Sequence, residues 1–320
     1  MEAPRYSFVL PVYNEEDTLP QLYKRLIAVV ETLDGPAELL FVDDGSSDGT
    51  HRILEDLQQR DPRVTPLRLA RNFGHQFAIT AGIDHARGDA IVIMDADLQD
   101  PPEVVPDLVQ RWQDGYDVVY AVRQRREGES WFKRATASAF YRLLRRFAET
   151  DLPVDAGDFR LIDRRAAAAF RSLPERNRYV RGMFSWIGLR QTGVAYARDE
   201  RYAGEPKYSY RQSLRLALDG IISFSLAPLR VALALGFAIA LVTFVIGLFA
   251  IVTRLAGVYS LPGWASIVVV VSFVGGVQLI LTGVVGLYVG RMYNEVKARP
   301  LYILDEAPRG EEQVRRPTAT

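Results

Sequence analysis

The chain has 320 residues, of which 48% are hydrophobic and 24% charged, proportions that are typical of a folded protein. Its 39 Lys and Arg residues balance its 39 Asp and Glu residues, so the formal net charge is zero, which argues against a nucleic acid as a partner. The chain contains no Cys, which excludes disulfides and Cys-based metal sites.

Strand and helix patterns alternate along the first part of the chain. Short apolar runs predict strands over residues 6–12, 38–42, 64–69, 90–94 and 117–122. Helical patterns lie between them, over residues 16–33, from a Ser47 or Asp48 cap to about Arg60, over residues 73–86, and from Pro101-Pro102-Glu103 onward. This alternation predicts an α/β fold with a parallel sheet that helices cover on both faces.

Polar residues follow three of these predicted strands, as Asn14-Glu15, Asp43-Asp44 and Asp95-Ala96-Asp97. Ligands of open parallel sheets bind beyond the carboxyl ends of the strands, so we expect these residues to gather at one edge. The carboxylates of Asp43 and Asp44 suit a base N–H or a ribose hydroxyl as hydrogen-bond donor. A helix N-cap is the simpler interpretation of this stretch, but Asp48 or Ser47 already supplies one.

Asp95 and Asp97 flank one small residue. In an extended segment, side chains two positions apart point to the same side, so both carboxylates can hold Mg²⁺ or Mn²⁺, which prefer oxygen ligands. The amide of Gln99 could add a further oxygen. A metal ion here would bridge a diphosphate and neutralise a leaving group. The alternative is an Asp-rich turn, but the position at the carboxyl end of a strand favours the metal site.

Further polar residues have two interpretations each. Arg71 lies between the third strand and its helix and could pair with phosphate, although a solvated Arg beside a helix cap explains it equally well. His75 follows, but the 3 His residues show no metal-binding spacing. Asp158 is a candidate to act near a reacting centre, with helix capping or an ion pair to Arg160 as the alternatives.

Two stretches of the C-terminal third, Val231–Thr253 and residues 264–290, contain no charged residue. About 20 apolar residues cross a bilayer, so we predict two transmembrane helices. The N-terminus lacks the apolar stretch of a signal peptide. Lys and Arg precede the first span and follow the second, whereas the connecting residues 255–263 have none, so the positive-inside rule predicts that both termini are cytoplasmic.

Residues 131–147 and 210–227 are amphipathic and predict helices that lie at the membrane interface, although the first pattern also fits an ordinary surface helix. The basic and aromatic segment 200–208 could close over a diphosphate or could supply positive-inside charge, and it could do both. The residues from about Pro308 onward are polar and predict a disordered tail.

Common catalytic motifs are missing from the sequence. There is no Walker A loop, no GxGxxG and no GxSxG. ATPases, dinucleotide-dependent oxidoreductases and α/β-hydrolases therefore lose their usual sequence support.

The ordered motifs carry a resemblance to a known family. They are Pro11-Val12-Tyr13-Asn14-Glu15, Val42-Asp43-Asp44-Gly45-Ser46-Ser47-Asp48-Gly49-Thr50, Arg71-Asn72-Phe73-Gly74, Asp95-Ala96-Asp97-Leu98-Gln99-Asp100-Pro101-Pro102-Glu103 and Gly157-Asp158-Phe159-Arg160-Leu161. The chain resembles family 2 glycosyltransferases of the GT-A fold, in the dolichyl-phosphate mannose synthase-like group. It is most similar to the bacterial polyprenyl-phosphate glucosyltransferases that have two C-terminal transmembrane helices.

The resemblance implies inverting transfer of a hexose from a nucleotide-sugar to undecaprenyl or dolichyl phosphate. UDP-glucose is the favoured donor, with GDP-mannose and a UDP-aminosugar left open. The implied organisation is a cytoplasmic catalytic domain over residues 1–209, an amphipathic juxtamembrane helix over 210–227, a transmembrane hairpin over 228–291 and a cytoplasmic tail over 292–320. The implied location is the cell membrane.

The resemblance also implies a role for each matching residue. The donor would bind Pro11, Tyr13, Glu15, Asp43, Asp44, Arg71 and Asp95, with the loop cations Arg201 and Lys207 closing over it. Mg²⁺ or Mn²⁺ would bind Asp95, Asp97 and Gln99, the acceptor phosphate would bind Arg123 and Arg134, and Asp97 and Asp158 would act at the reacting sugar. Pro206 departs from the family pattern, which has a small hydroxyl residue there.

Two other functions fit parts of the sequence. A processive polysaccharide synthase would need more transmembrane helices and a QxxRW motif, and Gln110-Arg111-Trp112 has the wrong spacing. A non-catalytic membrane adaptor could keep a nucleotide-binding fold, but it would not need Asp95, Asp97 and Asp158. The second span contains several glycines, which favour either a homo-oligomer or close packing within the chain.

Overall fold

The computed structural model describes residues 3–123, 156–176, 178–197, 227–256 and 263–305. These residues form two compact units. The first is an α/β unit that contains the described residues up to Ala197 together with Arg299 to Asp305, and the second is a pair of long helices. The amphipathic stretches 131–147 and 210–226 and the tail beyond Asp305 lie outside the described residues, so the predictions made for them stay predictions.

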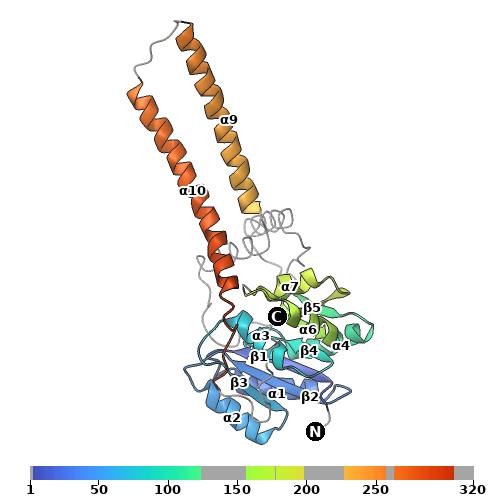
Figure 1. The fold of residues 1–320 in the computed structure, drawn as a ribbon. Helices are drawn as coiled ribbons and strands as arrows, with labels where there is room; N and C mark the ends of the chain where they lie inside the picture. Colours follow the sequence, from blue (N-terminus) through green and yellow to red (C-terminus); the bar gives the residue numbers. More distant parts are fainter. Residues whose placement is uncertain (1–2, 124–155, 177, 198–226, 257–262, 306–320) are drawn as a thin grey trace, which may run out of the picture. The chain divides into compact units, whose positions relative to one another are not determined.

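A seven-stranded sheet forms the centre of the α/β unit (Figure 1), in the order β3-β2-β1-β4-β6-β5-β7. The strands are β1 Tyr6–Val12, β2 Ala37–Asp43, β3 Val64–Arg68, β4 Ala90–Ile93, β5 Val118–Arg123, β6 Ala156–Asp163 and β7 Gln191–Tyr196. β3, β2, β1 and β4 are parallel to one another, which confirms the predicted arrangement for this half of the sheet.

The other half of the sheet corrects the prediction of a fully parallel sheet. β6 lies between β4 and β5 and is antiparallel to both, while β7 is parallel to β5. The sequence predicts a polar segment before an Ala-rich helix over residues 155–160, and this prediction is wrong because β6 begins at Ala156 and contains Asp158 and Arg160. Those two side chains are nevertheless buried, and so are Phe159 and Leu161, since the strand is central and covered on both faces.

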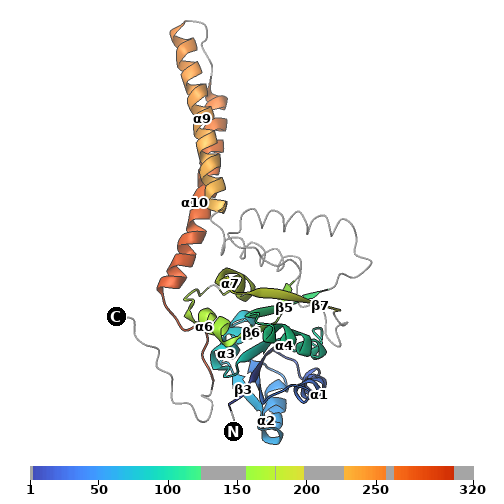
Figure 2. The same cartoon turned by 90° about the vertical axis from the view of Figure 1, so that its right-hand side faces the viewer.

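Helices cover both faces of the sheet, as predicted (Figure 2). They are α1 Leu19–Val30, α2 Thr50–Arg60, α3 His75–His85, the 3₁₀ turn η1 Pro102–Val104, α4 Val105–Gln113, α6 Arg164–Ser172 and α7 Val180–Ile187. Phe8 and Phe41 face the core that α1, α2 and α4 complete, whereas Val9 and Val42 face α3. Gly82 allows this second contact, because a side chain there would overlap Val9. Every residue of β1 and β2 is therefore buried.

The helical unit consists of α9 Ala227–Leu255 and α10 Trp264–Val296. Val231–Thr253 and Val269–Val296 are each long and apolar enough to cross a membrane. Large apolar side chains along both helices are exposed, among them Leu233 at 77% and Leu279 at 76%, as lipid-facing helices require. The two predicted spans are present as helices, and α10 continues past the predicted end of its charge-free stretch.

Candidate active site

The loops that follow β1 and β2 are tied together at the carboxyl edge of the sheet. The backbone N–H of Asp44 donates to the carbonyl oxygen of Val12 at 2.9 Å, so the two strands end side by side. Asn14 adopts a left-handed conformation with φ of 53°, its N–H donates to Ser46 Oγ at 3.0 Å, and its Oδ1 accepts from the N–H of Ser47 at 2.9 Å. The predicted gathering of the first two polar clusters is confirmed by these bonds.

Asp43 presents a buried carboxylate oxygen at this edge. The residue is 0% exposed, and its Oδ1 accepts from the N–H of Ser46 at 2.8 Å. Its Oδ2 accepts no hydrogen bond from any described residue, since His51 Nδ1 at 3.7 Å and Arg68 Nε at 4.0 Å are too far for one. A buried acceptor in this state suits an N–H donor from a ligand, because an unsatisfied buried polar atom is costly.

Asp44 supports the loop between β3 and α3. Its two oxygens accept from the N–H groups of Phe73 and Gly74 at 2.7 and 2.9 Å. Burial raises the pKa of Asp44, although these two hydrogen bonds act in the opposite direction. We interpret Asp44 as a residue that shapes the site through this loop. Arg71, in the same loop, is exposed and lies over the ring of Phe73, with 4.0 Å between guanidinium carbon and ring centroid.

Gly45 is required for the close packing of these two loops. It has φ of +72°, and a side chain there would place Cβ 2.6 Å from the carbonyl carbon of Arg71 and 2.7 Å from the N of Asn72. We expect Gly45→Ala to destabilise the protein by about 2 kcal/mol, since backbone strain and a clash with backbone atoms add. Denaturation of the detergent-solubilised protein measures this loss.

The matched control is Gly115→Ala. Gly115 also has a left-handed φ, +90°, but the nearest atom to an added Cβ is the end of the Arg190 side chain at 3.3 Å. We expect this variant to lose only about 1 kcal/mol, the cost of a left-handed non-glycine residue. Equal losses in the two variants would show that the contact between the loops contributes nothing.

Asp95, Asp97 and Gln99 occupy the partly exposed side of the segment after β4. The residues between them, Ala96 and Leu98, are buried, so the predicted alternation is present. The N–H of Gln99 donates to Asp97 Oδ1 at 3.1 Å. Asp95 Oδ1 is buried and accepts no hydrogen bond from the residues that the structure describes.

These oxygens fit the first ligands of a hard divalent cation. Among the described residues, no group of three or more His, Cys, Asp and Glu side chains is placed to hold a metal ion. Mg²⁺ and Mn²⁺ in phosphate-handling sites commonly take only one or two protein carboxylates and complete their coordination with phosphate oxygens and water. Two carboxylates and one amide therefore suit a metal ion that binds together with a diphosphate.

His75 connects this segment to β6. Its Nε2 lies 3.3 Å from Asp95 Oδ1 and 3.3 Å from Asp158 Oδ2. Burial alone would lower the pKa of His75, but the charges of Asp95 and Asp158 outweigh it and raise the pKa to about 9. Burial raises the pKa of Asp95 to about 6 even though His75 acts against the shift. Through the His75 imidazolium, the cluster Asp95-Ala96-Asp97 is thus joined to the same carboxyl edge of the sheet as the clusters after β1 and β2.

Asp158 is paired with Arg181 of α7, not with Arg160. Arg181 Nε and Nη2 donate to its two carboxylate oxygens at 2.8 and 2.9 Å. Burial would raise the pKa of Asp158, but Arg181 and His75 hold it well below its usual range. Arg160 instead donates to the carbonyl oxygen of Gly157 at 2.9 Å, and its guanidinium carbon lies 5.2 Å from the ring centroid of Phe184. Asp158 is therefore a fixed carboxylate.

Arg181 is a site residue that the sequence does not predict. It lies on α7, which begins at Val180, and no motif spacing links it to Asp158. The spacing of the His residues addresses His75 only as a metal ligand, and its role as a bridge between two carboxylates follows from the fold alone. The only available signal was its position directly after the Arg71-Asn72-Phe73-Gly74 motif.

The other predicted site residues have these positions. Pro11 lies in β1 beside Val42, Tyr13 is 40% exposed just beyond the strand, and Glu15 accepts a hydrogen bond from the Thr18 hydroxyl at 2.9 Å. Arg123, at the end of β5, contacts the Tyr196 hydroxyl, which donates to Asp100 in the segment after Asp97. Arg134, Arg201 and Lys207 lie outside the described residues.

Comparisons with known proteins agree with this geometry. The family model "Glycosyl transferase family 2" matches residues 7–170. The uncharacterized glycosyltransferase YkcC of Bacillus subtilis is 46% identical over 95% of this chain and 94% of its own length. The SfII prophage-derived bactoprenol glucosyl transferase of Shigella flexneri is 42% identical over 96% of this chain and 99% of its own length. A prophage bactoprenol glucosyl transferase homolog of Escherichia coli is 41% identical over 94% and 98%.

The chain belongs to glycosyl transferase family 2. It is a glycosyltransferase whose mixed α/β sheet has the GT-A arrangement, followed by two helices that can cross a membrane. The resemblance that the sequence motifs carry is confirmed, since relatives named as bactoprenol glucosyl transferases match over nearly the full length.

Proposed function

We propose that this protein transfers a hexose, with glucose as the first choice, from a nucleotide-sugar to a polyprenyl phosphate. The observation that carries the proposal is the acidic edge of the sheet, where Asp43, Asp95 and Asp158 gather within one chain that also has two apolar helices. A soluble donor and a lipid acceptor both fit such a chain. The printed names of the Shigella and Escherichia relatives support bactoprenol as the acceptor and glucose as the sugar.

The donor nucleotide would bind over the ends of β1 and β2. The unsatisfied Oδ2 of Asp43 would accept from a base N–H, with Pro11, Tyr13 and Glu15 beside it. Arg71 is exposed close to this position and would pair with the diphosphate, together with Arg201 and Lys207.

Asp95, Asp97 and Gln99 would hold Mg²⁺ or Mn²⁺, both of which accept oxygen ligands. When bound, the metal ion supplies neutralisation of the charge that develops on the leaving diphosphate. The residues of the chain fix where that charge can develop, because the Asp95 carboxylate is held in place by His75.

The acceptor needs little chemical activation. A phosphate monoester has a second pKa of about 6, so it is already an anionic nucleophile at neutral pH and no strong general base is required. A phosphate oxygen, positioned by Arg123 and Arg134, would attack the anomeric carbon while the bond to the nucleoside diphosphate breaks on the opposite face. This inverting route converts an α-linked donor to a β-linked product.

Asp158 would contribute a fixed negative charge beside the sugar. Glycosyl transfer develops positive charge on the sugar ring, and a buried carboxylate that stays ionised stabilises that charge. Arg181 and His75 keep Asp158 ionised and oriented.

We further propose that both termini and the α/β unit are cytoplasmic, because Lys and Arg residues precede the first span and follow the second. We also propose that the membrane is the cell membrane.

The test is a transfer assay with the purified full chain. UDP-glucose, UDP-N-acetylglucosamine and GDP-mannose are each supplied with undecaprenyl phosphate or dolichyl phosphate, with either Mg²⁺ or Mn²⁺. We expect a single glucosyl unit on the lipid, formed from UDP-glucose, lost on chelation and regained when the metal is restored. Nucleotide binding without any transfer would support the adaptor, and repeated addition of sugar would support a synthase.

A further inference from the structure

The segment that follows α10 in the chain lies along the outer edge of β3. We name residues Arg299 to Asp305 the C-terminal strap. The N–H of Ala70 donates to the carbonyl oxygen of Ile303 at 2.9 Å, and the N–H of Asp305 donates to that of Arg68 at 2.8 Å. Between these bonds Leu304 pairs with Leu69 in an antiparallel bridge. The strap therefore covers an edge of the sheet that would otherwise expose unpaired backbone groups.

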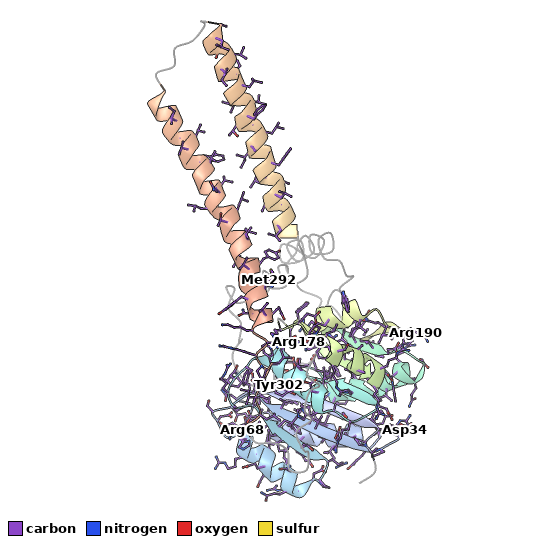
Figure 3. The ribbon with its side chains drawn as sticks, viewed as in Figure 1. Asp34, Arg68, Arg178, Arg190, Met292 and Tyr302 are labelled. Atoms are coloured by element: carbon purple, nitrogen blue, oxygen red, sulfur yellow. The ribbon has the colours of Figure 1, made fainter. Side chains whose placement is uncertain are left out.

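Side chains hold the strap against the α/β unit. Leu301 is 9% exposed, and Leu304 packs on the buried cluster that contains Val42 and Leu69. The Tyr302 hydroxyl donates to Asp84 Oδ2 of α3 at 3.1 Å. Figure 3 shows Tyr302 and Arg68 on the same side of this unit. The docking thus has an apolar anchor and polar contacts in addition to its backbone hydrogen bonds.

The strap is one chain segment away from the acidic edge. The N–H of Leu69 donates to the carbonyl oxygen of Asp43 at 2.8 Å, so Leu69 lies between Asp43 on one side and Leu304 on the other. Ala70, which donates to the strap, directly precedes Arg71 and the loop that Asp44 holds. A displacement of the strap would therefore move Ala70, which one peptide bond joins to Arg71 in the loop between β3 and α3.

A shared cation links the two segments a second time. Arg68 Nε lies 3.7 Å from Asp305 Oδ2 in the strap and 4.0 Å from Asp43 Oδ2 in the site. Asp305 thus attracts a guanidinium that would otherwise be drawn to Asp43. An Arg68 side chain paired fully with Asp43 would occupy the acceptor atom that a nucleotide base needs.

We propose that the C-terminal strap is a positioning element of the donor nucleotide site, which supports from behind the segment Arg68 to Ala70 that lies beside Asp43. The inference rests on the proposed donor site beside Asp43. Leu304 acts by fixing Leu69 and Ala70, and Asp305 acts by keeping Arg68 off Asp43. Neither residue contacts the substrate.

The first experiment compares Leu304→Ser with Ile303→Ser in the full chain. The two changes are alike in chemistry and adjacent, but Leu304 is packed whereas Ile303 is 54% exposed. For Leu304→Ser we expect hydrogen exchange at the amides of Ala70, Phe73 and Gly74 to be about tenfold faster, since local opening becomes easier. We expect KM for UDP-glucose to rise about fivefold with kcat within about twofold. Ile303→Ser should match the wild type, and Leu304→Met should restore it.

The second experiment tests the charge. Asp305→Asn should raise KM for UDP-glucose about threefold at low salt, with a smaller effect at high salt because the groups are partly exposed. Arg68→Gln added to Asp305→Asn should reverse the rise in KM.

Two results of the first experiment would overturn the role of the strap. One is unchanged amide exchange in Leu304→Ser, and the other is a KM for UDP-glucose that is the same in Leu304→Ser and Ile303→Ser. The exchange measurement needs no substrate, so it separates this outcome from failure of the proposed function, in which the wild type itself would not transfer glucose from UDP-glucose to the lipid.

Discussion

Replacing Asp97 by Ala should abolish sugar transfer while leaving the protein folded and membrane-bound. The Asp97 side chain lies on the partly exposed side of the segment after β4, beside Asp95 and Gln99. Loss of a metal ligand there would remove several kcal/mol of stabilisation from the departing diphosphate, which corresponds to at least about 1,000-fold in kcat/KM. The measurement is the rate of lipid-linked sugar formation by purified protein.

A direct measurement of metal binding gives this prediction a second readout. Titration of Mn²⁺ in the presence of UDP should give an affinity at least about tenfold weaker for Asp97→Ala, since one of few charged ligands is gone. Asp107→Ala is the matched control, because Asp107 is an exposed carboxylate in the first turn of α4. It should keep both transfer and Mn²⁺ affinity. Near-normal transfer by purified Asp97→Ala protein would refute the metal assignment.

Breaking the pair between Asp158 and Arg181 should cost both stability and activity. Asp158 is 3% exposed, so Arg181→Met leaves a buried carboxylate whose remaining ion-pair partner among the described residues is His75. Removing one partner of a buried ion pair destabilises by about 3–5 kcal/mol, and we expect about 3 kcal/mol because the Arg181 side chain is 39% exposed. A fall in kcat of about 100-fold should accompany it, since the carboxylate loses its fixed orientation.

A double-mutant cycle separates this pair from general damage to the fold. Arg181→Met, Asp158→Asn and the double variant should show a coupling free energy of about 2 kcal/mol in denaturation of the solubilised protein. The comparison pair is Arg165 with Asp117, whose Arg165 side chain is 65% exposed and whose coupling should stay below about 1 kcal/mol. Equal coupling in the two pairs would contradict a special role for Asp158.

Local patterns in the sequence were enough to predict the parallel half of the sheet. β1 and β2 are buried on both faces and are therefore mostly apolar, so the apolar runs predict both strands with nearly correct ends. The two apolar helices were predictable for a similar reason, because a bilayer imposes a minimum length. The polar clusters after β1, β2 and β4 gathered as expected, since parallel strands end at the same edge.

Contacts between distant segments decided the rest. The sequence does not predict β6, because its buried Asp158 and Arg160 are satisfied by Arg181, His75 and backbone oxygens that no local pattern reveals.

What the sequence by itself determined is the family, the edge of the sheet that carries the acidic residues and the two apolar helices, because each depends on short-range periodicity or on ordered motifs. What only the tertiary structure decided is the set of partners: His75 between two carboxylates, Arg181 on Asp158, and the C-terminal strap on β3. The physical reason is that ion pairs and edge pairing depend on distances in space, which chain spacing does not specify.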